Sequence, residues 1–242
     1  MRSESFCKRT SSKPGRLMHR VLTVVEGFTE RAIVEQTFAP YLALRGVSLH
    51  AKFVGNPGHK GGIRNFQSVC NEILALLNQE RASYVSTFFD YYGLPNDWPG
   101  MRQSKGKRAQ EIAKVVEDAM HNEVVLKMDS ADDPRRFIPY VQMHESEALL
   151  FSDANVMASV FERPDLESQF TQIVHECGEC EEIDDQSAPS KRIERLFPAY
   201  RKGSGARAHA PIIVRRIGMD RLRQACPHFN LWLTALEALG FP

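Results

Sequence analysis

Acidic side chains stand directly behind two apolar runs of this chain. Glu26 follows the run Val21 to Val25, and Asp90 follows the run Tyr84 to Phe89. A buried strand gains nothing from a carboxylate at its end, so each acid is either incidental surface or held over a site. In open α/β sheets, ligands lie beyond the carboxyl ends of the strands, where helix N-termini also point. We therefore expect Glu26 and Asp90 to lie at one rim of a sheet.

Carboxylates gathered at such a rim would need a partner charge. They repel one another, and their pKa values rise unless a cation or a proton binds among them. Hard oxygen ligands select hard cations, so Mg²⁺ or Mn²⁺ is the expected occupant. With a phosphate ester as substrate, one or two such ions neutralise charge and align an attacking water. The pattern thus indicates metal-dependent hydrolysis of a phosphodiester.

A third acid of this kind follows the run Phe137 to Gln142, in the group His144-Glu145-Ser146-Glu147. The second histidine of the zinc motif His-Glu-x-x-His is absent here. Two residues apart on a helix, Glu145 and Glu147 point in different directions and reach one ion only if the segment is not yet helical. Glu145 is the preferred ligand, and Glu147 is expected to be solvated or paired with a lysine.

The elements that would hold these acids alternate along the first part of the chain. Apolar runs predict strands, and helical periodicity predicts helices between them. The expected strands are 21–25, 49–54, 84–89, 124–128 and 137–142, and the expected helices are 29–45, 63–79 and 104–121. Such alternation favours an α/β fold with a mostly parallel sheet covered on both faces by helices.

Beyond residue 150 the pattern changes to helices and polar loops. We therefore expect three parts: a basic flexible tail at 1–18, an α/β core at 19–151, and a helical extension at 152–242 packed on the core. The acidic stretch 176–185, which holds Cys177 and Cys180, is expected to be an exposed loop. Half of a zinc site is the alternative there, but the chain has no second cysteine pair.

The composition is that of an ordinary globular protein with one substantial core. Of 242 residues, 43% are hydrophobic and 25% are charged, and 31 basic side chains nearly cancel 30 acidic ones. The net charge of +1 does not call for nucleic acid or membrane, so local clusters must carry any such argument. No apolar stretch is long enough to cross a bilayer, and we expect a cytoplasmic protein with no membrane partner.

Four segments together carry a resemblance to a known family: VEGFTE at 25–30, FFDYYGLPNDWPG at 88–100, MHESEALLFSD at 143–153, and PSKRIERLFPAYRKGSGA at 189–206. The first resembles the opening motif of the Toprim domains in nucleases of the overcoming-lysogenisation-defect type. All four in this order look like a Toprim-like family of bacterial proteins known as domain of unknown function 4276. The resemblance runs from about Arg20 to about Leu239. It implies a small parallel sheet flanked by helices.

By this resemblance, Glu26 matches the strand-end glutamate that acts in Toprim enzymes as a metal ligand or general acid/base, and Glu30 matches the second carboxylate. Asp90 matches the first aspartate of an Asp-x-Asp motif, but Tyr92 occupies the second place. A missing ligand weakens the case for two metal ions unless another acid supplies the oxygen. The expected ligands are Glu26, Glu30, Asp90 and Glu145, with Asp97 and Glu147 as other sources of that oxygen.

Each acid also has a structural interpretation. Glu30 on a first helical turn suits the helix dipole and could be a solvated cap partner of Thr29. Asp90 could open a turn before Gly93 and Pro95. The catalytic interpretation requires instead that the acids gather closely enough to share one ion.

Basic residues in the last of the four segments could bind phosphates. Lys191 and Lys202 are candidates to offset negative charge at a scissile group, with Arg192 and Arg201 as further contacts to a nucleic acid. A charge run is otherwise a solvated face. Lys60, in a glycine-rich loop, could help to cradle a phosphate ahead of a helix, although the spacing is not that of a Walker A sequence.

The residues and the resemblance together predict a metal-dependent phosphodiesterase, a nuclease that cuts DNA or RNA. Members of the family are often encoded near ATPases, which implies an AAA or ABC-type ATPase partner in a bacterial defence or mobile-element system. A homodimer is also open. The alternative is a catalytically weak Toprim-like module that regulates an ATPase or binds nucleic acid, which Tyr92 in place of aspartate favours. A phosphotransferase acting on small molecules is a third hypothesis.

Overall fold

The computed structural model describes residues 18–55, 63, 65–184, 187–201 and 203–241. Its centre is a parallel sheet in which the first strand lies between the second and the third. The strands, in the spatial order β2-β1-β3-β4 with β5 paired to the end of β3, are β1 (His19–Val25), β2 (Val47–Phe53), β3 (Tyr84–Asp90), β4 (Phe137–Ile138) and β5 (Val141–Gln142). The predicted α/β fold with a mostly parallel sheet is confirmed.

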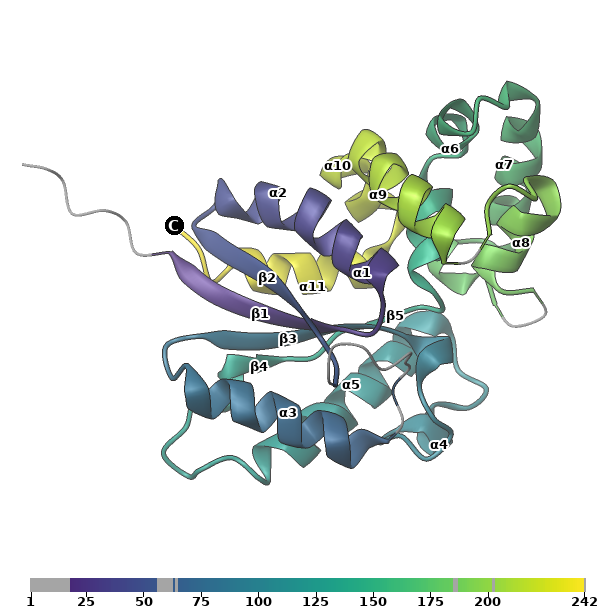
Figure 1. Cartoon of the computed structure of the whole chain (residues 1–242). Coiled ribbons are helices and arrows are strands. Elements are labelled where there is room, and N and C mark those ends of the chain that lie inside the picture. Colours follow the sequence, from purple (N-terminus) through teal and green to yellow (C-terminus); the bar gives the residue numbers. More distant parts are fainter. Residues whose placement is uncertain (1–17, 56–62, 64, 185–186, 202, 242) are drawn as a thin grey trace, which may run out of the picture.

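Helices cover both faces of the sheet, which Figure 1 shows nearly edge-on. Above the sheet in this view lie α1 (Phe28–Ile33), α2 (Ala39–Ala43) and α11 (Pro227–Glu237), and below it lie α3 (Phe66–Gln79) and α5 (Ala109–Val125). The short helix α4 (Met101–Ser104) precedes α5. The predicted covering of both faces is therefore present.

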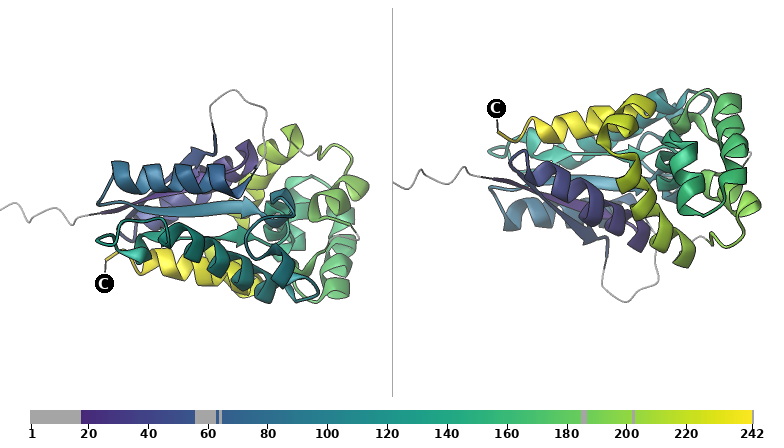
Figure 2. Two further views of the ribbon diagram at one scale, coloured as in Figure 1. Left: turned by 90° about the horizontal axis from the view of Figure 1, so that it is seen from below. Right: turned by 90° about the horizontal axis from the view of Figure 1, so that it is seen from above.

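The remaining helices gather around one end of the sheet. In both views of Figure 2 they lie beyond the carboxyl ends of the strands or beside α1. They are α6 (Ala154–Val160), α7 (Glu167–Cys177), α8 (Pro189–Leu196), α9 (Ser204–Ile217) and α10 (Met219–Ala225). The rim where the strands end is thus enclosed by later parts of the chain.

Two apolar cores, one on each face of the sheet, hold these layers together. The central strand β1 contributes to both: Val21 and Val25 lie in the core with α1 and α11, and Val24 lies in the core with α3 and α5. A near-continuous buried run is typical of a parallel strand covered on both faces. The edge strand β2 instead alternates between buried and more exposed positions over part of its length.

Two predicted strands need correction. The strand expected at 124–128 is wrong, because Val124 lies in the last turn of α5 and is buried on the same helix face as Met120 and Val116. The four-residue spacing of buried positions is helical, and it outweighs the β-branched character of the run. The strand expected at 137–142 is two short strands, since Pro139 between them has no N–H for the ladder.

The predicted helices differ from the structure mainly at their ends. The helix expected at 104–121 begins at Ala109 and continues to Val125. The helix expected at 29–45 is helical from Phe28 to Ala43, with a π-helical turn at Val34–Phe38. That turn ends just before Pro40, which cannot donate the backbone hydrogen bond of a regular helix.

The acidic stretch 176–185 is not an exposed loop throughout, which corrects the expectation. Cys180 and Glu181 are buried in a 3₁₀ turn. The carboxylate of Glu181 accepts hydrogen bonds from the backbone N–H groups of His228 and Phe229, both at 2.9 Å, at the start of α11. Glu181 therefore caps a helix, whereas Glu176, Glu179 and Asp184 are exposed.

The C-terminal helices share a core with the sheet. Trp232 of α11 donates from Nε1 to Oγ of buried Ser86 on β3 at 2.9 Å, and its ring stacks on Tyr140 with centroids 4.6 Å apart. The division into a core at 19–151 and an extension at 152–242 remains a proposal. The predicted tail lies outside the described residues except for Met18. Within the described part, no helix combines the length and apolar character that a membrane span requires.

Candidate functional site

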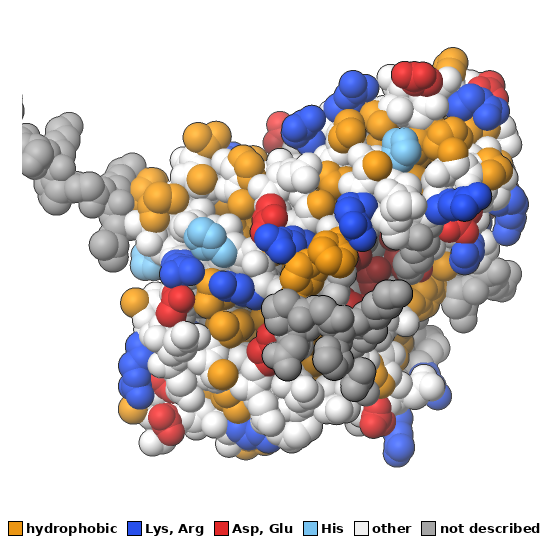
Figure 3. All heavy atoms as spheres, viewed as in Figure 1, with side chains coloured by type: hydrophobic (Ala, Val, Ile, Leu, Met, Phe, Trp, Pro, Cys, Tyr) orange, Lys and Arg blue, Asp and Glu red, His pale blue; other side chains and the backbone are white. Residues whose placement is uncertain are grey.

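A cavity of about 300 Å³ opens at the carboxyl ends of β1 and β3. Four carboxylates line it: Glu26, Glu30, Asp90 and Glu147. Glu30, Asp90 and Glu147 are 9%, 7% and 2% exposed, whereas Glu26 is half-buried. In Figure 3, acidic side chains are visible in a hollow of this face beside apolar and basic ones. Acids from distant parts of the chain therefore meet in one place.

The strand register explains why the first two acids meet. Val25 pairs with Phe88 across adjacent parallel strands, so Glu26 and Asp90 leave the sheet at the same rim. Glu30 joins them from the first turn of α1. Only two residues, Glu26 and Gly27, separate β1 from α1. The predicted gathering of Glu26, Glu30 and Asp90 around one cavity is present in the structure.

Two glycines make room for two of these carboxylates. A Cβ atom on Gly27 would lie 2.5 Å from Oε2 of Glu30, and a Cβ on Gly93 would overlap Oε2 of Glu26. Gly27 has an extended backbone, with φ of −131°, so it is needed for space and not for a special dihedral. The absence of side chains at these positions lets both carboxylates lie against the backbone of the cavity wall.

Ser146 links three of the acids. Its backbone N–H donates to Oδ1 of Asp90 at 2.8 Å, and its hydroxyl lies 3.1 Å from Oε1 of Glu30 and 3.4 Å from Oε2 of Glu147. Ser146 is fully buried at the start of a 3₁₀ segment, Ser146–Ser152. This segment therefore positions the carboxylates of β3 and α1 relative to one another.

Glu147 reaches the cavity, whereas Glu145 has a different partner. Oε2 of Glu145 accepts a hydrogen bond from the backbone N–H of Ser190 at 2.9 Å, in the first turn of α8. Glu147 receives a hydrogen bond at 3.4 Å from the hydroxyl of buried Tyr200. Burial and the neighbouring Glu147 raise the pKa of Tyr200 well above its usual value. Glu147 is buried, so the expectation that it is solvated is wrong, whereas a lysine partner stays a prediction.

Tyr92, in the place of the second aspartate, lies in the wall of the cavity. It also lines a neighbouring hollow of about 320 Å³ together with Tyr91, His144, Lys105 and Lys107. The Tyr92 and His144 rings lie 5.0 Å apart. Tyr92 thus forms a partition between two hollows, and Asp97 does not line either of them within the part of the chain that the structure describes.

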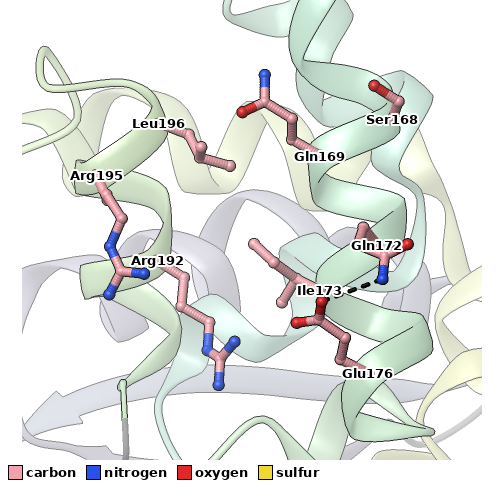
Figure 4. A pocket seen from close by; sticks show the side chains of 8 residues that line it. All are labelled: Ser168, Gln169, Gln172, Ile173, Glu176, Arg192, Arg195 and Leu196. Carbon is pink, nitrogen blue, oxygen red and sulfur yellow. Dashed lines mark hydrogen bonds between the residues drawn. The ribbon is translucent and has the colours of Figure 1, made fainter.

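The predicted basic residues lie elsewhere or outside the described residues. Lys191 is exposed and pairs with Glu194 at 2.7 Å on α8. Arg192 lies with Arg195 in a separate hollow of about 300 Å³, facing polar side chains of α7 (Figure 4). Exposed Arg201 is not among the residues that line the carboxylate cavity. Lys60 and Lys202 lie outside the described residues.

Arg207 and Phe28 line the cavity and were not predicted as site residues. Arg207 lies in the first turn of α9, one residue beyond the fourth of the segments that suggested the family. Phe28 lies inside the first of them, VEGFTE. Of the described residues around the cavity, Arg207 is the one whose side chain carries a fixed positive charge.

The donor chemistry of the cavity fits Mg²⁺ or Mn²⁺, since carboxylate oxygens are the ligands that these ions prefer. Among the described residues, however, no three His, Cys, Asp or Glu side chains are arranged to hold an ion as they stand. Asp90 and Glu30 are hydrogen-bonded to Ser146 instead. Rotation of these side chains would have to accompany metal binding. The same finding gives no support to zinc at Cys177 and Cys180.

The comparison with protein families agrees with the sequence resemblance. A family model described as "Domain of unknown function (DUF4276)" matches residues 25–237. Two solved structures of the C-terminal region of the Xanthomonas campestris pv. campestris OLD protein, phased with mercury and with platinum, are similar over most of the chain. Identity is 16% for both, the TM-scores are 0.38 and 0.37, and the alignments cover 91% and 89% of this chain and 96% and 94% of the others. No curated protein matches the sequence.

Proposed function

The chain belongs to the DUF4276 family, and on that premise we propose that it is a metal-dependent phosphodiesterase, a nuclease whose active site is the carboxylate cavity. The substrate would be the backbone of DNA or RNA. The proposal places the enzyme in a bacterial defence or mobile-element system beside an AAA or ABC-type ATPase, as the sequence resemblance implies.

The observation that carries this proposal is the convergence of Glu26, Glu30, Asp90 and Glu147 on one cavity. They come from the ends of two strands, the first turn of a helix and a 3₁₀ segment. Burying several carboxylates together is unfavourable unless a cation, a proton or hydrogen-bond donors compensate for lost hydration and mutual repulsion. A site that binds a divalent cation gives this arrangement a function.

In this proposal the four carboxylates hold the metal, with Ser146 setting their positions. Mg²⁺ or Mn²⁺, when bound, would neutralise phosphate charge and make a water more acidic. Arg207 lies where it can contact a phosphate oxygen and offset negative charge, which is the role first assigned to Lys191 and Lys202. Glu145 accepts a hydrogen bond from the backbone of α8, and in this proposal it holds the 3₁₀ segment against α8 and is not a metal ligand.

Nicking of supercoiled plasmid and cleavage of labelled RNA in the presence of Mn²⁺ or Mg²⁺ test the proposal. We expect Glu26→Gln and Asp90→Asn each to lower the rate by about 100-fold or more, the scale of a lost catalytic group. Asp118→Asn is the matched control, because Asp118 is exposed on α5, pairs with Lys114 at 2.8 Å, and is not among the residues that line the cavity. Circular dichroism must show that all three variants remain folded.

A thermal-shift titration makes the metal part of the test independent of activity. A ligand that binds only the folded state raises the melting temperature. Mn²⁺ should therefore raise the melting temperature of the wild type and of Asp118→Asn more than that of Glu26→Gln. Unchanged nicking in Glu26→Gln or Asp90→Asn would contradict the proposed site.

The second candidate is a catalytically weak module that regulates an ATPase or binds nucleic acid. Two observations favour it: Tyr92 stands in the cavity wall in place of an aspartate, and the described acids are not arranged to hold an ion as they stand. This hypothesis predicts no hydrolysis with any divalent ion, together with saturable binding of nucleic acid or of the ATPase partner.

A further inference from the structure

Phe28 is an exposed aromatic residue at the mouth of the carboxylate cavity. Its side chain lines the cavity, and the residue is 57% exposed. A single exposed apolar side chain is ordinary on a protein surface. Phe28 differs because it immediately follows the Glu26-Gly27 pair, so its ring lies beside the acids that would act on a phosphodiester.

Phe28 belongs to a row in which two adjacent aromatic rings lie between two arginine side chains. The Arg207 guanidinium carbon lies 4.3 Å from the Phe28 ring centroid. The Phe28 ring packs edge-on against Phe53, with centroids 4.8 Å apart, and the Arg31 guanidinium carbon lies 5.0 Å from the Phe53 centroid. We call these four residues the aromatic row. It joins α9, α1 and the end of β2, and its members Phe28 and Arg207 line the cavity.

Contacts within the aromatic row and to one neighbour fix the positions of its members. Nε of Arg31 donates to Oε1 of Glu35 at 2.9 Å, one helical turn away. Phe53 is half-buried at the end of β2, where it supports the Phe28 ring from one side. Figure 3 shows apolar side chains between basic ones next to the acidic hollow. The surface therefore presents a supported aromatic ring between positive charges.

This chemistry matches one class of ligand. A nucleobase stacks on an exposed aromatic ring, arginine stacks on bases and contacts phosphates, and such surfaces bind single strands with little sequence preference. A base inside a duplex has both faces covered by its neighbours. On the proposed function, we propose that the aromatic row holds an unpaired nucleobase beside the scissile phosphate, so that the protein takes its polynucleotide as a single strand.

Binding of single-stranded oligonucleotides without divalent metal tests this inference. The probes are fluorescein-labelled dT12 and rU12, measured by anisotropy in EDTA at low salt, with a labelled 12-base-pair DNA duplex beside them. Phe28→Ala should weaken binding of at least one single strand by about tenfold, since stacking on an aromatic ring is worth about 1–3 kcal/mol per base. Its affinity for the duplex should change less than twofold.

Two further variants separate stacking from mere loss of surface. Phe28→Tyr keeps a planar ring and should restore single-strand affinity to within about threefold of wild type. Leu44→Ala removes another strongly exposed apolar side chain, on the segment after α2, and should leave binding unchanged. Arg207→Gln should weaken binding and reduce its salt dependence, because a phosphate contact releases counterions.

Several outcomes overturn the inference. The first is a wild-type protein that binds neither single strand. The second is a Phe28→Ala variant that binds both single strands as tightly as wild type. The third is a Phe28→Ala variant that loses the same affinity for the duplex as for the single strand. A change of oligomeric state in Phe28→Ala by analytical ultracentrifugation, with binding intact, would make the aromatic row a contact between copies of the chain instead.

The inference and the proposed function can fail separately. Absence of nicking with every divalent ion, together with Phe28-dependent binding of a single strand, ends the hydrolysis proposal and leaves the stacking site. The converse result is that Glu26→Gln abolishes metal-dependent nicking while Phe28→Ala leaves single-strand binding unchanged. That result supports the nuclease proposal and contradicts the stacking site.

Discussion

The carboxylates of Glu26 and Glu30 owe their positions to the glycines that they touch. Gly93 comes from the turn after β3, so the β1 acid rests on a segment that belongs to the neighbouring strand. The atom that a Cβ at Gly93 would meet is the end of a flexible side chain. A methyl group there should move the carboxylate without disturbing the sheet.

Gly93→Ala should therefore weaken Mn²⁺ binding by about 10- to 100-fold, the scale seen when supporting positions of metal sites are altered. The melting temperature without metal should stay within about 2 °C of wild type, which corresponds to less than about 1 kcal/mol in a chain of this size. Isothermal titration with Mn²⁺ and thermal melts measure the two effects.

The double variant Gly93→Ala with Glu26→Gln is the control for this prediction. If the methyl group acts through Glu26, the double variant binds Mn²⁺ no more weakly than Glu26→Gln alone, because coupled positions are not additive. If the double variant instead binds Mn²⁺ more weakly than Glu26→Gln by the full effect of Gly93→Ala, Gly93 acts through some other contact.

At the scale of the elements, two acids of the stretch 176–185 bind the N-termini of two helices that are distant in the sequence. Glu181 accepts from two N–H groups at the start of α11, and Oε1 of Glu182 accepts from the Ala109 N–H at 3.2 Å at the start of α5. Carboxylates stabilise helix N-termini through these hydrogen bonds and the helix dipole. Burial raises the pKa of Glu181, with His228 acting in the opposite direction.

Glu181→Ala should lower the free energy of unfolding by about 2 to 3 kcal/mol, because it leaves two buried N–H groups of α11 without an acceptor. Urea denaturation measures this change. Glu179→Ala is the control, since Glu179 is about half exposed and its ion pair with Arg108 is long at 3.9 Å. It should cost less than about 1 kcal/mol. Equal effects of the two substitutions would contradict the capping role.

At the scale of the whole molecule, the C-terminal helices and the sheet together form the wall of the carboxylate cavity. The sheet supplies Glu26 and Asp90, while Arg207 of α9 and Tyr200 come from the last fifth of the chain. α11 is docked on the sheet by Trp232 and is tied to α5 by a bond of 2.9 Å between His228 Nε2 and Glu117 Oε1. The cavity would lose part of its wall without these helices.

The tie between α5 and α11 should make stability depend on pH. Burial raises the pKa of Glu117 above 4.5, and Glu117 raises that of His228 above 6.5 although burial opposes it. A group whose pKa is raised on folding contributes stability that is full below its unfolded pKa and is lost as pH rises through its folded pKa.

The melting temperature of the wild type should therefore fall as the pH rises above 4.5 and then above 6.5, the ordinary pKa values of the two groups, and Glu117→Gln should reduce this fall. Differential scanning calorimetry across this range measures it. Exposed Glu111 on the same helix provides the control, since Glu111→Gln should leave the wild-type pH dependence unchanged. A fall of the same size in Glu117→Gln would show that other groups cause it.

The sequence by itself determined the alternation of strands and helices, the parallel sheet, the family, and the presence of acids behind β1 and β3. These features depend on short segments of the sequence. An apolar run or a helical spacing involves only a few consecutive residues, and a strand is expected to end where such a run stops. The errors at 124–128 and 137–142 arose where a short apolar run suited two structures and a proline or helical burial decided between them.

Only the tertiary structure decided which later residues join those acids. Ser146 contacts Glu30 across 116 residues of chain, and Glu147, Tyr200 and Arg207 reach the site by the packing of the C-terminal helices. The choice of Glu147 over Glu145 depends on a 3₁₀ segment that turns one carboxylate toward the cavity and the other toward Ser190. Contacts between residues so far apart leave no periodicity in the sequence, because they follow from how whole elements pack.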